Sequence, residues 1–170
     1  MKYFIFIFLL FLNGIVLFGQ SRSGTSFRSG INRIGIYFDQ SLNFEINNHE
    51  LDAGLRFYGT DYVFEHDVVG LSLGYAYNFS SSNVYFAPGI SSTFFSENKS
   101  NSKLIVSELM MNNKLGVNLG QRWSLFTHIG IGAVFNRHNN FNIGSTSTTS
   151  YINYEIALGI KFYWRIPVDD

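Results

Sequence analysis

Large apolar residues alternate with small, polar or charged residues over long stretches of this chain. The pattern is clearest in residues 151–164, where even positions are large and apolar or aromatic and odd positions are mostly polar, charged or small. Successive side chains on a β-strand point to opposite faces, so this stretch predicts one long strand with an apolar face and a polar face. It exceeds the ~5–6 residues usual in soluble sheets and suits a tilted crossing of a ~30 Å hydrocarbon layer.

The same two-residue period recurs along the chain and predicts further strands at residues 34–46, 51–58, 68–79, 84–94, 104–119 and 123–136. Single-chain bacterial barrels have an even number of strands, so an eighth is expected at residues 21–30. Alternation there is weak, and Phe27 is its one large apolar residue. Nowhere does the 3.6-residue period of an amphipathic helix persist over three turns, so the predicted fold is all-β. The fold class we expect is an antiparallel up-and-down transmembrane β-barrel of eight strands.

Residues 1–20 have a different pattern, typical of a secretory signal peptide. Lys2 precedes an apolar stretch, residues 3–18, and small polar residues follow it. A membrane-spanning helix is the alternative, but the apolar run is slightly short and no basic cluster follows it. We therefore expect a cleaved signal peptide, export through the inner membrane and a barrel domain at residues 21–170.

The composition narrows the class of protein further. Only 14% of the 170 residues are charged and 18% are aromatic, against a usual ~25% charged, which suits a surface that faces lipid. Lys plus Arg equals Asp plus Glu at 12 each, and the lack of a basic excess argues against a nucleic-acid binder. There is no cysteine, which excludes disulfides and Cys-ligated metals. The four histidines are scattered, so no metal and no cofactor are expected.

Two features favour a membrane barrel over a secreted soluble β-barrel binding protein, which is the alternative. The polar faces carry mostly Gly, Ala, Ser and Asn, as suits a narrow lumen, whereas a solvated outer face carries many Lys and Glu. In addition, aromatic residues fall at one level if successive strands alternate in direction. This predicted aromatic girdle comprises Tyr75, Tyr77, Phe79, Phe86, Trp123, Phe162 and Trp164.

The connections between the predicted strands also differ in length. Short turns near residues 47–49, 80–83 and 120–122 would lie at one end of the barrel, and longer polar loops at the other. Short periplasmic turns and longer outer loops are typical of outer-membrane barrels. The longer loops are where an extracellular partner would bind, although they contain no known motif: residues 59–67, 96–103 and 137–150.

The final strand carries a further pattern, in which Gly159 is followed three and five residues later by the aromatic residues Phe162 and Trp164. With this pattern, residues 31–164 resemble small bacterial outer-membrane β-barrel proteins of the OmpA/OmpX-like superfamily, in the Asn- and Phe-rich style of Bacteroidota. The resemblance implies an outer-membrane location with outer-membrane lipid around the barrel. It also implies that the barrel-assembly machinery recognises these three residues as an assembly signal.

The predicted inner face holds five acidic and four basic residues: Arg33, Asp39, Glu45, Asp52, Arg56, Glu108, Lys114, Glu155 and Lys161. An eight-stranded barrel is filled by side chains and buried charges must be paired, so we expect a lumen charge network. Bulky inward residues argue against an open pore: Tyr37, Tyr58, Tyr85, Phe126 and Tyr163. A narrow ion or small-solute channel, or a ligand-binding barrel, is the alternative.

A lipid-modifying enzyme is a further alternative, and it would need a nucleophile beside a base. Ser124 and His128 share the inner face but stand four residues apart, or ~13 Å at the rise of a strand. That separation exceeds hydrogen-bond reach, although a cross-strand partner such as Glu108 leaves the alternative open. We expect no catalysis, and a structural or surface-interaction role.

Overall fold

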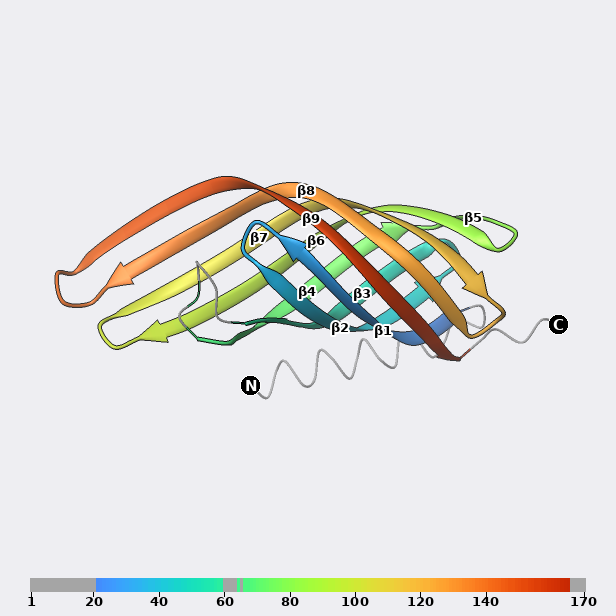
Figure 1. Ribbon diagram of the computed structural model, residues 1–170, viewed down its shortest axis with the longest axis horizontal. Helices are drawn as coiled ribbons and strands as arrows, with labels where there is room; N and C mark the ends of the chain where they lie inside the picture. The colour runs from blue at the N-terminus through green and yellow to red at the C-terminus, as the bar shows by residue number, and fades with distance from the viewer. Residues whose placement is uncertain (1–20, 60–63, 65, 166–170) are drawn as a thin grey trace.

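The computed structural model describes residues 21–59, 64 and 66–165; the expected signal peptide lies outside this part. The described residues form one antiparallel β-sheet that closes on itself (Figure 1). Its strands are β1 (Ser21–Asn32), β2 (Ile36–Ile46), β3 (His49–Tyr58), β4 (Val68–Tyr77), β5 (Phe79–Ser81), β6 (Val84–Lys99), β7 (Ser102–Leu119), β8 (Trp123–Asn140) and β9 (Ser145–Arg165). Within these described ranges, no helix is long and apolar enough to cross a membrane.

Apart from β4 and β5, which do not pair with each other, consecutive strands pair along the chain, and β1 also pairs with β9 and closes the barrel. β4 and β5 both pair with β6 and act as one crossing of the wall, so the barrel has the expected eight strands. The ladder places Ala76 opposite Gly89 and Phe79 opposite Phe86. The break at Asn78 therefore lies next to Pro88, which has no N–H to donate to the ladder.

β1 confirms the eighth strand, although its own sequence pattern is weak. Its residues pair with β2 from Ser21 to Ile31 and with β9 up to Asn32. Phe27 points outward beside Phe38, with ring centroids 6.2 Å apart, and the next residue, Arg28, is buried. Pairing with two neighbouring strands thus stabilises a strand that its local alternation barely predicts.

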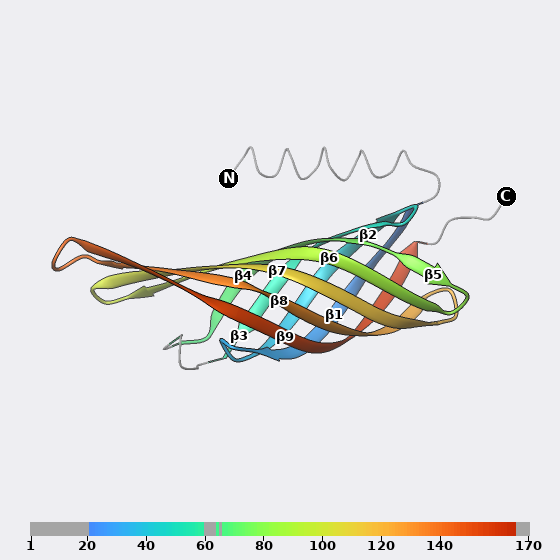
Figure 2. The same ribbon diagram turned by 90° about the horizontal axis from the view of Figure 1, so that it is seen from above.

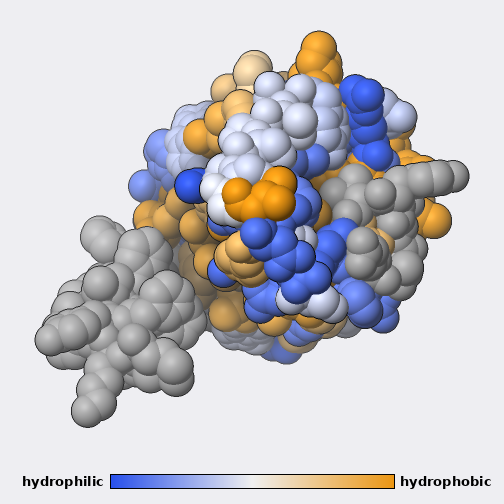
Figure 3. Space-filling model, turned by 90° about the vertical axis from the view of Figure 1, so that its left-hand side faces the viewer, coloured by the Kyte–Doolittle hydropathy of each residue, from blue (hydrophilic) through white to orange (hydrophobic). Residues whose placement is uncertain are grey.

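The wall of the barrel is inverted relative to a water-soluble protein. Large outward side chains are strongly exposed, for example 71% for Ile36 and 69% for both Met111 and Leu158, whereas Arg56 and Glu155 are buried. Soluble monomers rarely expose apolar area on this scale, and the arrangement is the one expected of a wall that faces lipid. In the end-on view of Figure 3, hydrophobic residues show along the flanks of the barrel, and hydrophilic and neutral residues cover much of its end.

Two predicted loops are in fact largely strand. β6 runs to Lys99 and β7 begins at Ser102, while β8 runs to Asn140 and β9 begins at Ser145, so residues 96–103 and 137–150 were wrongly predicted as loops. Their Ser, Thr and Asn residues have loop-like composition, but cross-strand pairing continues to the tips of both hairpins. Figures 1 and 2 show an elongated barrel with these hairpins at one end, the hairpin end, and short turns at the other, the turn end.

Candidate functional site

The lumen contains two groups of charged or titratable side chains. The hairpin-side cluster consists of Arg28, Asp39, Arg56, Glu108, His128 and Glu155, and the turn-side cluster consists of Glu50, Asp52, Lys114 and Lys161. The period of two along each strand sends these side chains inward, and the curvature of the sheet brings them together.

Arg56 on β3 is the centre of the hairpin-side cluster and is fully buried. Its Nε lies 3.1 Å from Asp39 Oδ2, and its Nη1 lies 2.8 Å from Glu155 Oε2 and 3.2 Å from Glu108 Oε2. The guanidinium carbon also lies 4.1 Å from the centre of the Tyr37 ring. One arginine thus pairs with carboxylates from three different strands and stacks on an aromatic ring, as its planar shape allows.

Arg28 on β1 is the second cation of this cluster and was not among the residues predicted to face the lumen. Its Nη2 donates to Asp39 Oδ2 at 2.8 Å, and its Nη1 contacts His128 Nδ1 at 2.9 Å. His128 Nε2 lies 2.8 Å from Glu155 Oε1. A neutral imidazole that accepts at Nδ1 and donates from Nε2 satisfies both contacts. The outward position of Phe27 is the pattern that would have placed Arg28 inside.

The cluster has three carboxylates and only two arginines, and neutral groups solvate the remaining negative charge. Glu108 Oε1 accepts from Asn153 Nδ2 at 3.0 Å and Asn32 Nδ2 at 3.2 Å. The hydroxyl of Tyr58 lies 3.4 Å from the same oxygen. Buried charge is tolerated where hydrogen bonds replace water, and these amides do so for Glu108.

The turn-side cluster has two lysines and two carboxylates. Lys114 Nζ lies 2.8 Å from Glu50 Oε1 and 2.5 Å from Asp52 Oδ2. Lys161 Nζ donates to the same oxygen of Glu50 at 2.6 Å. Glu50 was missed because the strand was predicted to begin at Leu51, although the period of two places Glu50 on the same face as Asp52.

The remaining two residues of the predicted charge network lie elsewhere. Glu45 is half-buried near the turn end, where it accepts hydrogen bonds from Tyr163 Oη at 3.2 Å and Asn78 Nδ2 at 3.3 Å. Arg33 was wrongly placed in the lumen. Because β1 ends one residue before it, Arg33 lies in the turn between β1 and β2 and is exposed. Its guanidinium donates to the carbonyl oxygen of Ile152 at 3.2 Å.

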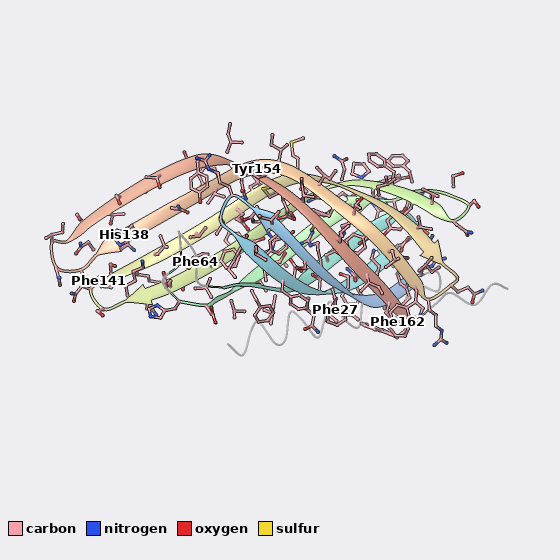
Figure 4. All side chains as sticks on the ribbon, in the orientation of Figure 1. Phe27, Phe64, His138, Phe141, Tyr154 and Phe162 are labelled. Carbon is pink, nitrogen blue, oxygen red and sulfur yellow. The ribbon has the colours of Figure 1, made fainter. Side chains whose placement is uncertain are left out.

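A cluster of buried apolar side chains, the apolar plug, fills the lumen on the hairpin side of the charges. Tyr58, Phe64 and Phe95 are its aromatic centre, with ring centroids 5.0 to 5.8 Å apart. Phe64 is labelled in Figure 4. The other buried members are Ile34, Tyr37, Val68, Leu104, Val106, Val134 and Ala157. The strand predicted at residues 34–46 begins in fact at Ile36, and Ile34 lies in the turn before β2, where it is buried.

Glycines make room for aromatic rings on the turn side of the lumen. A Cβ on Gly159 would lie 2.3 Å from the Phe126 ring directly opposite it, and one on Gly116 would lie 2.3 Å from the Tyr85 ring. The two rings and their glycines form one row across β6, β7, β8 and β9. Gly159, a member of the predicted assembly signal, is therefore also required for packing.

Between the two charge clusters lies a cavity of about 20 Å³, lined in part by Arg28, Asp52, Lys114 and His128. A cavity of about 10–15 Å³ or more holds one water molecule, so this space suits a single bridging water.

Ser124 and His128 are both fully buried, and Ser124 Oγ donates to Asn118 Oδ1 at 2.7 Å. In the described residues, no group of three or more His, Cys, Asp or Glu side chains is arranged to hold a metal.

The aromatic residues of the predicted girdle lie at the turn end. Trp123 and Phe162 pack with ring centroids 4.6 Å apart, and Phe79 lies 4.8 Å from Tyr77 and 6.5 Å from Phe86. The set also includes Tyr75, which contacts the ring of His49, and Trp164. All seven are exposed or half-buried.

No protein-family model matches the chain, and no curated protein matches it in sequence. Solved structures do resemble it. A major outer membrane protein from Thermus thermophilus is 15% identical with a TM-score of 0.53, and the match covers 85% of this chain and 99% of that one. The N-terminal β-barrel domain of Pseudomonas aeruginosa OprF is 13% identical with a TM-score of 0.55, covering 85% and 98%. The chain therefore has the fold of bacterial outer-membrane barrels.

Proposed function

We propose that this protein resides in the outer membrane as a barrel with a closed lumen, and that its role is structural or surface interaction. The observation that carries the proposal is the inverted wall, with large apolar side chains outside and ten charged or titratable side chains in the two clusters inside. Lipid is the solvent in which such a wall is stable. The likeness in fold to outer-membrane proteins supports the location.

The proposed orientation places the turn end in the periplasm and the hairpin end outside. Short turns on one side and longer projections on the other are typical of outer-membrane barrels. The aromatic girdle then lies where lipid meets the periplasm. In this proposal Gly159, Phe162 and Trp164 serve as the assembly signal that the barrel-assembly machinery recognises, after export by a signal peptide.

The interior argues against the channel alternative. An ion entering from the hairpin end meets the plug around Phe64, and then Arg56 with its three carboxylates. The cavity beyond has room for about one water. Passage would require breaking buried ion pairs, so we propose a non-conducting lumen.

The interior also argues against the lipid-modifying enzyme alternative. His128 is occupied by Arg28 and Glu155, and Ser124 is bonded to Asn118. Both are buried, so a lipid in the surrounding bilayer has no approach to either. A surface role remains, for which the β6–β7 and β8–β9 hairpins offer the largest projections (Figure 1).

Fractionation and gel mobility test the location. The protein should appear in the outer-membrane fraction and migrate differently on a denaturing gel before and after boiling, because a folded barrel resists detergent at room temperature. Recovery as a soluble periplasmic species would refute the proposal. Planar-bilayer recordings of the purified barrel should show no steps above the bilayer baseline, and regular conductance steps would favour the channel alternative.

A further inference from the structure

The outward face of the barrel wall has almost no charged residues. Among the strand residues whose side chains the structure describes, the Lys and Arg side chains that face outward are Lys103 on β7 and Arg137 on β8, each between inward-facing neighbours. In all the described strands, the Asp and Glu side chains face the lumen. The outward charges are thus all positive and are concentrated on two adjacent strands.

These two cations lie next to each other at the edge of the apolar band. Arg137 is opposite Ile105 and Lys103 is opposite Asn139, so the two cations are diagonal neighbours on one face. Diagonal neighbours lie ~7–8 Å apart, within reach of long side chains. Each cation also lies two residues beyond the last large apolar outward residue of its strand, which is Ile105 on β7 and Phe135 on β8.

No carboxylate of the described residues pairs with either cation. The ion pairs of the described residues involve basic residues other than Lys103 and Arg137. Like charges side by side on a sheet are unfavourable without a counter-charge. A polar donor completes the surface, because Thr148 on β9 lies directly opposite Arg137 and is exposed.

We propose that Lys103 and Arg137 bind the phosphate of an anionic lipid head group in the leaflet at the hairpin end. The proposal rests on the proposed function, since it requires lipid around the barrel. The acyl chains of that lipid lie against the apolar column below the cations, which includes Ile105 and Phe135. This column is the reason to assign a lipid and not a free phosphate ion, because a head group held by these cations places its chains directly on the apolar band. Arginine supplies a bidentate donor pair to phosphate and lysine a point charge.

Native mass spectrometry of the full chain, folded in detergent micelles, tests this inference. The protein is titrated with dioctanoyl phosphatidic acid, and separately with dioctanoyl phosphatidylcholine and with inorganic phosphate. We expect one phosphatidic acid to bind more tightly than phosphatidylcholine. The K103Q/R137Q double variant should bind phosphatidic acid roughly 30-fold more weakly, from the usual attraction of two basic residues to an anionic lipid surface.

R122Q is the matched control, because Arg122 is also exposed and positive but lies in a turn at the opposite end. It should bind phosphatidic acid as the wild-type protein does. Equal affinity of the double variant, or an equal loss in R122Q, overturns the inference. Displacement of the lipid by inorganic phosphate at equal concentration overturns the assignment to a lipid.

The heat-modifiability of each preparation separates the two proposals. A folded, heat-modifiable barrel that does not discriminate between the two lipids overturns this inference and leaves the proposed function standing. A chain that is soluble and not heat-modifiable overturns the proposed function itself.

Discussion

Replacement of Arg56 by methionine should destabilise the barrel more than any other single loss of charge in the lumen. Arg56 lies within 3.2 Å of Asp39, Glu108 and Glu155 and is fully buried. Methionine matches much of its length but carries no charge, so three carboxylates would lose one shared partner. Breaking a buried ion pair by removing one partner costs about 3–5 kcal/mol, which corresponds to a shift of roughly 10²- to 10⁴-fold in the unfolding equilibrium.

The assay is equilibrium unfolding of the barrel in urea, with the folded fraction read from its gel mobility before boiling. Arg33→Met is the matched control, since Arg33 is exposed at the turn between β1 and β2. A surface substitution of this kind changes stability by about 0.5 kcal/mol or less. Addition of Glu155→Gln to Arg56→Met should recover part of the loss, because it removes one of the stranded negative charges, and coupling energies of about 0.5–3 kcal/mol are usual for residues in contact.

Two results would refute this reasoning. If Arg56→Met costs no more than Arg33→Met, the lumen is hydrated enough that its charges need no partners, and the closed lumen is wrong. If Glu155→Gln deepens the loss caused by Arg56→Met, Glu155 is stabilised mainly by Arg28 and His128, and Arg56 is not the centre of the cluster.

Three further predictions address packing, assembly and chemistry. Gly159→Val should destabilise the barrel by about 1–3 kcal/mol through overpacking against the Phe126 ring, as measured by urea unfolding. In a double variant, Phe126→Ala should relieve part of that cost. The Phe162→Ala/Trp164→Ala variant should lower the amount of barrel in the outer membrane several-fold by immunoblot, and normal levels would count against the assembly signal. His128→Ala should leave the mass profile of the lipids of the host membrane unchanged, since its partners are structural; a profile that depends on His128 would restore the enzyme alternative.

Local alternation of apolar and polar residues is sufficient to predict the fold class and the two faces of most strands. Side-chain direction on a strand has a period of two whatever the strand pairs with, so the inward positions of Asp39, Arg56 and Glu155 could be read from local alternation. The same local rule placed Leu158 and Met111 on the outer wall. These predictions needed no knowledge of which strands are neighbours.

Which inward residues meet, and where strands begin and end, depends on how the strands pair in the folded barrel. Arg28 contacts His128, which lies 100 residues away in the chain, and such a contact depends on closure of β1 against β9. Residues 96–99, 102–103, 137–140 and 145–150 remain strand because partners continue beside them, although their polar composition predicts loops. Pairing between strands is a cooperative property of the whole sheet. Alternation along one strand therefore determines which side of the wall each side chain faces, and the register between strands determines the ion pairs and the apolar plug.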